Sequence, residues 1–177
     1  SNYSYTDSFL EYDYTRNEEL SNDCFAVALR GNILDTSKAA FYSQYDHIKT
    51  NGASYVFQSV YSGFAFLTPQ AGTNVNNWNY TTVDTNNGRT VGEKYRYRVT
   101  TENIDTDSNG EDDSVQIVIY RGTYTNGVLG NMTHRYTYVD SGDASREPVL
   151  VPGIMAFVAK NGTAHKIDNV MFTDVHE

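Results

Sequence analysis

The most distinctive group of chemistry-bearing residues is an acidic stretch in the middle of the chain, at 105–113. Its oxygen-bearing side chains alternate along the chain as Asp105, Asp107 and Asn109, and Asp113 closes the stretch. Calcium takes about six to eight oxygen ligands, and alternate side chains on a tight loop can converge on one ion. The alternative is a well-solvated acidic hairpin loop, because Asn109-Gly110 alone explains a turn.

A second group combines aromatic rings with polar neighbours, as a sugar-binding site requires. An aromatic ring stacks on the apolar face of a sugar while nearby amides and hydroxyls bond its polar groups. The candidate rings are Trp78, Tyr80, Tyr120, Tyr136 and Tyr138. Trp78 lies in the amide-rich stretch 76–80, and Tyr136 and Tyr138 are expected to share a strand face with His134. For each ring, packing against the protein interior is the alternative interpretation.

Two arginines, Arg96 and Arg98, complete the candidate ligand-binding residues. They alternate with Tyr95 and Tyr97, so the period of two predicts that the arginines face away from the tyrosines. We assign both tyrosines to the core. A guanidinium group can bond sugar hydroxyls or a uronic carboxylate. The alternative is that the arginines pair with Asp or Glu across the sheet.

No catalytic constellation of a hydrolase emerges from the sequence. Glycosidases need two carboxylates spaced across the scissile bond, whereas Glu93, Glu102 and Glu111 fall at predicted strand ends or in the acidic stretch. The four histidines lack metal-ligand spacing, and Gly-x-Ser-x-Gly is absent. A polysaccharide lyase could use Tyr136, His134 and Arg96, which keeps that enzyme class as an alternative. We expect a non-catalytic protein.

Short strands with a period of two are the elements that must position these residues. They are predicted at 23–30, 39–45, 54–57, 64–68, 78–83, 94–100, 114–121, 133–139, 154–160 and 166–172. No stretch predicts a long helix, which favours an antiparallel two-sheet β-sandwich or jelly roll over a parallel α/β sheet. The last two strands are expected to form a hairpin through Asn161-Gly162. We predict one all-β domain over 1–177.

The composition of the chain disfavours several classes of binding partner. The chain has 177 residues, 13 basic against 22 acidic, a net charge of −9 and 15 tyrosines. A nucleic-acid partner is disfavoured, because such binders carry basic patches. No apolar run approaches the roughly 20 residues of a membrane-spanning helix, so membrane insertion is not expected. An acidic surface repels acidic polymers, and neutral glucans are therefore expected to fit better than pectin or sulfated chains.

Three stretches carry a resemblance. They are Tyr5-Thr6-Asp7-Ser8-Phe9, then Tyr95-Arg96-Tyr97-Arg98-Val99 with the strand that follows at 115–120, and finally Gly153-Ile154-Met155-Ala156-Phe157 with Lys166-Ile167-Asp168-Asn169-Val170. Together they resemble concanavalin-A-like and laminin-G-like jelly-roll domains, in particular bacterial carbohydrate-binding modules. The resemblance implies a two-sheet jelly roll that binds a polysaccharide on its concave sheet or at edge loops. It also implies a structural Ca²⁺ ion at a second site, with Asp7 and Asp168 as ligands beside backbone groups near the N-terminus.

The expected function is a non-catalytic module that binds a neutral glucan, either starch-type or from the plant cell wall. The resemblance places such a module in a larger multidomain secreted protein, extracellular or at the cell surface of a bacterium. A protein-binding adhesin or surface domain is the alternative class. It would use the same sandwich with a large apolar patch in place of a stacking platform.

Overall fold

The computed structural model describes residues 7–18, 24–31, 55–60, 63–69, 78–85, 90–142, 148, 150, 154–160 and 165–174. Strands dominate these residues, and none of them is helical. The prediction of an all-β fold is confirmed for the described residues. The strands are β1 (Ser8–Arg16), β2 (Cys24–Gly31), β3 (Tyr55–Val60), β4 (Gly63–Pro69), β5 (Trp78–Thr85), β6 (Lys94–Ile104), β7 (Ser114–Thr125), β8 (Val128–Leu129), β9 (Thr133–Asp140), β10 (Ile154–Lys160) and β11 (His165–Asp174).

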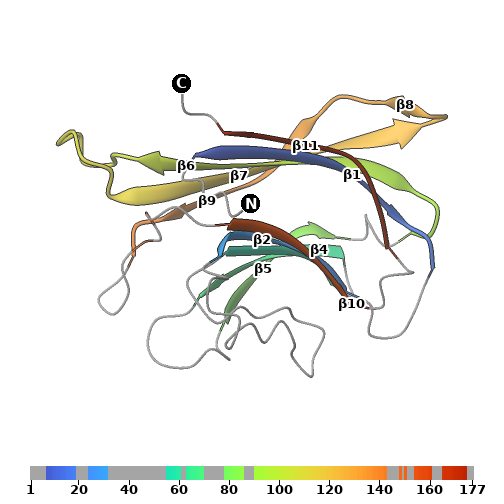
Figure 1. Ribbon diagram of the computed structural model, residues 1–177, viewed down its shortest axis with the longest axis horizontal. Coiled ribbons are helices and arrows are strands. Elements are labelled where there is room, and N and C mark those ends of the chain that lie inside the picture. Colours follow the sequence, from blue (N-terminus) through green and yellow to red (C-terminus); the bar gives the residue numbers. More distant parts are fainter. Residues whose placement is uncertain are drawn as a thin grey trace.

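Backbone hydrogen bonds join these strands into two antiparallel sheets, which Figure 1 shows one above the other. The six-stranded sheet has the order β11-β1-β6-β7-β8, and β9 also pairs with β7. The five-stranded sheet has the order β10-β2-β3-β4-β5. Side chains from both sheets contribute to one hydrophobic core. Direct ring contacts cross between them, with centroids 5.9 Å apart for Tyr12 and Phe25 and 5.2 Å apart for Phe57 and Tyr97.

The core accounts for much of the tyrosine content. Tyr12, Tyr14, Tyr55, Tyr95 and Tyr97 are all buried. The assignment of Tyr95 and Tyr97 to the core is therefore confirmed. A buried phenol usually finds a polar partner for its hydroxyl, and the Tyr55 hydroxyl donates to the buried Asp140 carboxylate at 2.5 Å.

The predicted terminal hairpin is wrong. β10 pairs with β2, whereas β11 pairs with β1, so the last two strands belong to different sheets. An Asn-Gly pair favours a tight turn locally but does not determine which strand the chain pairs with next. A different pair, Asn126-Gly127, makes the tight turn between β7 and β8, with φ angles of 52° and 79°.

The first strand, β1, is absent from the sequence-based prediction, although it lies between β11 and β6. Its alternation is regular, with Leu10, Tyr12 and Tyr14 buried in the core. Glu11 and Asp13 point to the other face and are also nearly buried, a position in which charged residues are rare unless paired. The two-residue strand β8 is too short to show a pattern. The strand predicted at 39–45 lies outside the described residues.

Candidate functional site

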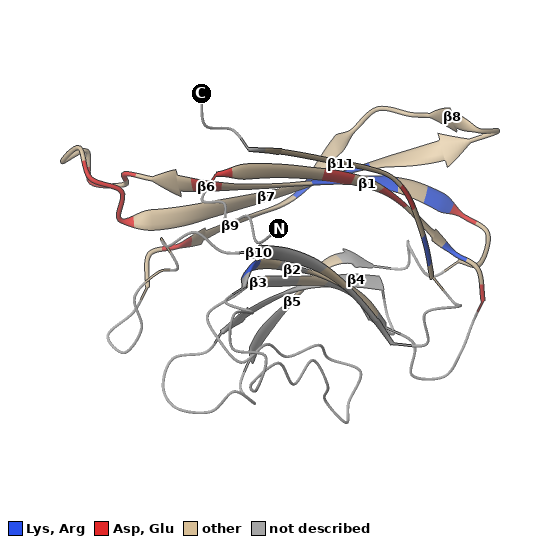
Figure 2. Cartoon of the chain, viewed as in Figure 1, with Lys and Arg blue, Asp and Glu red and all other residues tan. Residues whose placement is uncertain are grey.

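Four of the candidate residues lie on the side of the six-stranded sheet that faces away from the core, here called the open face. Along β6, Tyr95 and Tyr97 point into the core, so Lys94, Arg96 and Arg98 lie on the open face. Figure 2 shows these cations beside the acidic residues of β1. The arginines therefore face as the sequence predicted.

One row of side chains crosses the open face from strand to strand. Arg98 of β6 lies opposite Glu11 of β1 on one side and opposite Tyr120 of β7 on the other. Tyr120 in turn lies opposite His134 of β9. The order Glu11, Arg98, Tyr120, His134 is called the cross-strand row below. Three of its four members are residues that the sequence analysis selected for ligand binding.

The outer part of the row is accessible and polar. The side chain of Arg98 is 39% exposed, His134 is exposed and Tyr120 is half-buried. The Tyr120 and His134 rings meet edge to face, with centroids 5.8 Å apart. His134 Nε2 forms a hydrogen bond of 2.8 Å with Thr137 Oγ1. This pair places aromatic rings and hydrogen-bonding groups side by side on the open face.

A buried carboxylate, Asp13, organises the open face next to the row. It is 1% exposed and accepts hydrogen bonds from Arg96 Nε at 2.7 Å and from the Asn169 amide at 2.6 Å. Lys94 Nζ lies 2.9 Å from its Oδ2, and the Tyr124 hydroxyl lies 3.0 Å from both carboxylate oxygens. Burial raises the pKa of Asp13, but these four donors outweigh it and hold the pKa well below its usual range. Asp13 therefore remains charged.

Glu11 holds the two arginines in a similar way. Its Oε2 accepts from Arg98 Nε at 2.9 Å and lies 2.8 Å from Arg98 Nη2, while Arg96 Nη1 lies 3.3 Å from Oε1. The arginines thus pair with carboxylates across the sheet, which is the alternative that the sequence analysis left open. The Arg98 guanidinium also lies 4.9 Å from the centroid of the Phe9 ring. Its position is therefore fixed from two sides.

Two of the predicted aromatic residues lie on the other side of the sheet. A β-bulge between Ile119 and Tyr120 shifts the register of β9, so that Tyr136 faces Ile119 while His134 faces Tyr120. Tyr136 and Tyr138 consequently pack against the core. The expectation that they share a face with His134 is wrong, because the bulge inserts one residue and reverses the alternation.

Trp78 and Tyr80 belong to β5 of the five-stranded sheet, where their backbones pair with Pro69 and Leu67. Their side chains are outside the described part of the structure. They lie in a different sheet from Arg98 and Tyr120. The eight residues predicted to bind a ligand therefore do not form one site, and only Arg96, Arg98, Tyr120 and His134 share a face.

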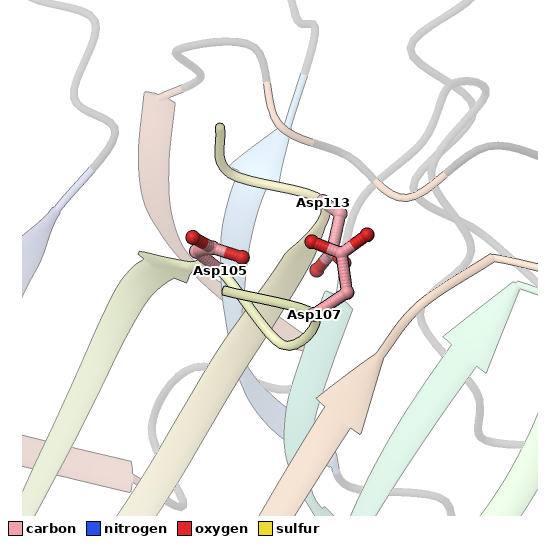
Figure 3. A group of neighbouring side chains, drawn as sticks. All are labelled: Asp105, Asp107 and Asp113. Atoms are coloured by element: carbon pink, nitrogen blue, oxygen red, sulfur yellow. The ribbon is translucent and has the colours of Figure 1, made fainter. Parts of the chain in front are cut away.

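The acidic stretch forms the loop between β6 and β7 and gathers three carboxylates. Oxygen atoms of Asp105, Asp107 and Asp113 all lie within 4.8 Å of one another (Figure 3), so the group could hold a metal ion. The Gly110 amide donates to Asp105 Oδ2 at 2.7 Å, which is the main cause of the lowered pKa of Asp105. Asn109 donates to Asp107 Oδ2 from its side-chain amide at 3.2 Å. The loop thus favours the ionised form of Asp105 and holds the three carboxylates close together.

The second predicted ion site is not assembled. Asp168 lies opposite Asp13, whereas Asp7 precedes Ser8, which lies opposite Asp174 at the far end of the same strand pair. Asp168 pairs instead with Lys166 at 2.9 Å, and Asp7 accepts the Asn103 amide at 2.8 Å. The two carboxylates therefore cannot share one ion.

The Ile-Asp-Asn-Val stretch has a structural role in the described residues. Asn169 adopts a φ of 49° at the point where the pairing of β1 and β11 shifts register. Its side-chain amide then reaches Asp13. Asn tolerates this left-handed conformation better than most residues do. Sequence patterns did not single out Asp13, Lys94 or Tyr124 as site residues. The charges that alternate with aromatic residues at 10–15 were nevertheless a signal for a strand with a polar face.

Protein-family models, curated proteins and solved structures provide no match to this chain. In the described part of the chain, no helix has the length and apolar character needed to cross a membrane. Because no known protein matches, the function of the open face is inferred from the residues of this chain alone.

Proposed function

We propose that the protein is a non-catalytic polysaccharide-binding module and that its ligand lies across the open face. The observation that carries this proposal is the cross-strand row, in which an arginine, a tyrosine and a histidine lie on three neighbouring strands. Strands are spaced by about 4.8 Å, so the row extends over roughly 10 Å. An extended chain of sugars could contact all three side chains, with the rings packing on it and Arg98 bonding its oxygens.

The rigidity of the row supports this proposal. Glu11 and the Phe9 ring hold Arg98, while Tyr120 and His134 pack against each other. Side chains that are fixed before binding lose little conformational entropy when a ligand arrives. Binding sites built on strands are also more precise than sites on loops.

The fold proposal is a jelly-roll sandwich like that of the concanavalin-A-like domains. Two antiparallel sheets with ring contacts between them support it. With that fold we also propose the setting that the resemblance implies, a module of a larger multidomain protein that is secreted or at the surface of a bacterial cell.

Removal of the two rings in the row is expected to abolish most polysaccharide binding. Aromatic contacts at a binding site are worth about 1–3 kcal/mol each, so Tyr120→Ala and His134→Ala should each weaken binding by roughly fivefold or more. Affinity electrophoresis on gels that contain a panel of acidic and neutral polysaccharides measures the effect.

Val128→Ala is the matched control, because Val128 is 70% exposed at the tip of the β7–β8 hairpin. Loss of retardation with Trp78→Ala but not with Tyr120→Ala would move the site to the five-stranded sheet. Retardation by none of the polysaccharides would reject the proposed function and favour a protein-binding surface domain.

A polysaccharide lyase is the second candidate, favoured by the adjacency of Arg98, Tyr120 and His134. Such a reaction needs a base for the proton beside a uronic carboxylate, an acid for the leaving oxygen and a cation that neutralises the carboxylate. Tyr120 and His134 are the two proton-transfer groups and Arg98 is the cation. The ultraviolet absorbance of unsaturated uronate ends, followed over time with an acidic polysaccharide, would reveal this activity.

We also propose that the ion held by Asp105, Asp107 and Asp113 is Ca²⁺, with Asn109 contributing to the loop. The support is a set of hard carboxylate oxygens on a glycine-containing turn. Because a ligand that binds only the native state raises stability, we expect Ca²⁺ to raise Tm and a chelator to lower it. Differential scanning calorimetry of the native protein and of Asp113→Asn measures the change.

The variant serves as the control for ions bound elsewhere, because it removes one carboxylate from this loop. A Tm that is the same with Ca²⁺ and with chelator would contradict a tight site. An equal response of native protein and variant would place the ion at another part of the chain.

A further inference from the structure

We infer that the polysaccharide bound at the open face is acidic, with carboxylate or sulfate groups along its chain. This inference rests on the proposed function and deepens it. It departs from the neutral glucan that the net charge of −9 suggested, because the charge at this face differs from the charge of the whole chain.

The negative and positive side chains of the open face lie at different depths. The carboxylates of Glu11 and Asp13 are 8% and 0% exposed, whereas the side chains of Lys94, Arg96 and Arg98 are 31%, 22% and 39% exposed. Three cations therefore face two carboxylates, and the carboxylates lie beneath them. On β1 and β6, the charged groups that a ligand meets first are therefore the cations.

The three cations of the open face lie along a single strand. Lys94, Arg96 and Arg98 occupy alternate positions of β6, so they are spaced by roughly 6.6 Å along one strand. Lys94 Nζ lies 4.6 Å from the centroid of the Tyr124 ring, much as Arg98 lies over Phe9. These held cations meet the cross-strand row at Arg98, and a group of cations there favours acidic groups on a ligand over neutral ones.

The acidic residues are distributed unevenly along the chain. Five of the 22 acidic residues, Asp105, Asp107, Glu111, Asp112 and Asp113, lie in the loop between β6 and β7. On the open face itself, Glu102 is exposed, and it lies past Thr100 on β6, toward that loop. Asp168, also on this face, is paired with Lys166. Exposed charges farther apart than the Debye length, about 8 Å at physiological salt, interact little. The net charge of the chain therefore does not decide what binds at Arg98.

The test uses two polymers that differ only in charge, polygalacturonate and the same polymer with its carboxyl groups reduced to alcohols. We expect affinity electrophoresis to show at least about tenfold tighter binding of the acidic form, since a hydrogen bond to a charged group is worth about 1.5–3 kcal/mol. Dextran sulfate is compared with dextran in the same way, which separates carboxylate from sulfate recognition. Binding should weaken as salt rises.

Arg98→Gln should remove most of the preference for the acidic polymer. Lys166→Gln is the matched control, because Lys166 is a 58% exposed cation near the start of β11, opposite Thr15 of β1. It lies roughly 15 Å along the strand from the row. Thermal unfolding of both variants confirms that they fold.

Each outcome of this test has one meaning. Equal binding of the charged and reduced polymers, or binding of neutral glucans alone, would overturn the acidic ligand while leaving the proposed function intact. Binding of no polysaccharide would overturn both. Single-stranded DNA that binds as tightly as polygalacturonate would also overturn the inference, because the face would then attract any polyanion.

Discussion

Replacement of Asp13 by alanine is expected to lower the free energy of unfolding by about 2–4 kcal/mol. Asp13 is 1% exposed and is bonded to Arg96, Lys94, Asn169 and Tyr124. Its loss removes several charge-assisted hydrogen bonds at once. The cost stays below that of a fully buried unpaired charge, because Lys94 and Arg96 are partly exposed and can turn toward water.

Urea denaturation at neutral pH measures this effect. Asp168→Ala is the matched control, since Asp168 lies opposite Asp13 on β11 but its side chain is 36% exposed and bonds only Lys166 among the charged residues described. Exposed pairs contribute about 0–1 kcal/mol. Equal losses in the two variants would mean that Asp13 is not the centre of the network.

The pH dependence of the stability of the native protein follows from the pKa of Asp13. That pKa is lowered in the folded state, so the native state binds fewer protons than the unfolded state near pH 4. The stabilisation by Asp13 is therefore complete above the unfolded pKa of about 3.9 and is lost as pH falls from there toward the folded value. The difference between native protein and Asp13→Asn should be largest at neutral pH and shrink below about pH 4.

Local patterns in the sequence identify most of the strands. Tyr95 and Tyr97 alternate with Arg96 and Arg98, and this period of two correctly predicts both the strand and its two faces. The described strands β2 to β7 and β9 to β11 each overlap a predicted strand. These patterns are sufficient to predict a strand because each pattern depends only on residues that are close in sequence.

Pairing between distant segments is harder to predict. Which strand β11 joins depends on partners more than 150 residues away, such as Asp13 and Asn169. Likewise, the bulge between Ile119 and Tyr120 reverses the faces of β9, and a bulge of this kind leaves no clear mark in one sequence. The candidate site was therefore predicted in part, with Arg98, Tyr120 and His134 selected but their common row unseen.

The same limit applies to electrostatics. A count of charges predicts a repulsive acidic surface, yet the charges on β1 and β6 separate by depth, with Glu11 and Asp13 beneath Arg96 and Arg98. Only the register of the two strands establishes that separation. Local charge, not net charge, therefore determines the electrostatic potential at the open face.

The largest loss of stability is expected from Phe25→Ala, at about 3–5 kcal/mol. Phe25 is fully buried on β2, and its ring lies 5.1 Å from Tyr14 and 5.9 Å from His165, measured between centroids. Tyr14 and His165 belong to β1 and β11 of the other sheet. Truncation therefore leaves a cavity between the two sheets, and cavity lining atoms lose their dispersion contacts.

Urea denaturation of Phe25→Ala beside Phe25→Leu and Val128→Ala tests this expectation. Leucine keeps much of the buried apolar volume and should cost less than alanine, while the 70% exposed Val128 should tolerate truncation within about 0.5 kcal/mol. If Phe25→Ala costs no more than Val128→Ala, the two sheets are not packed around this ring. The jelly-roll proposal would then fail, because a sandwich depends on apolar side chains buried between its sheets.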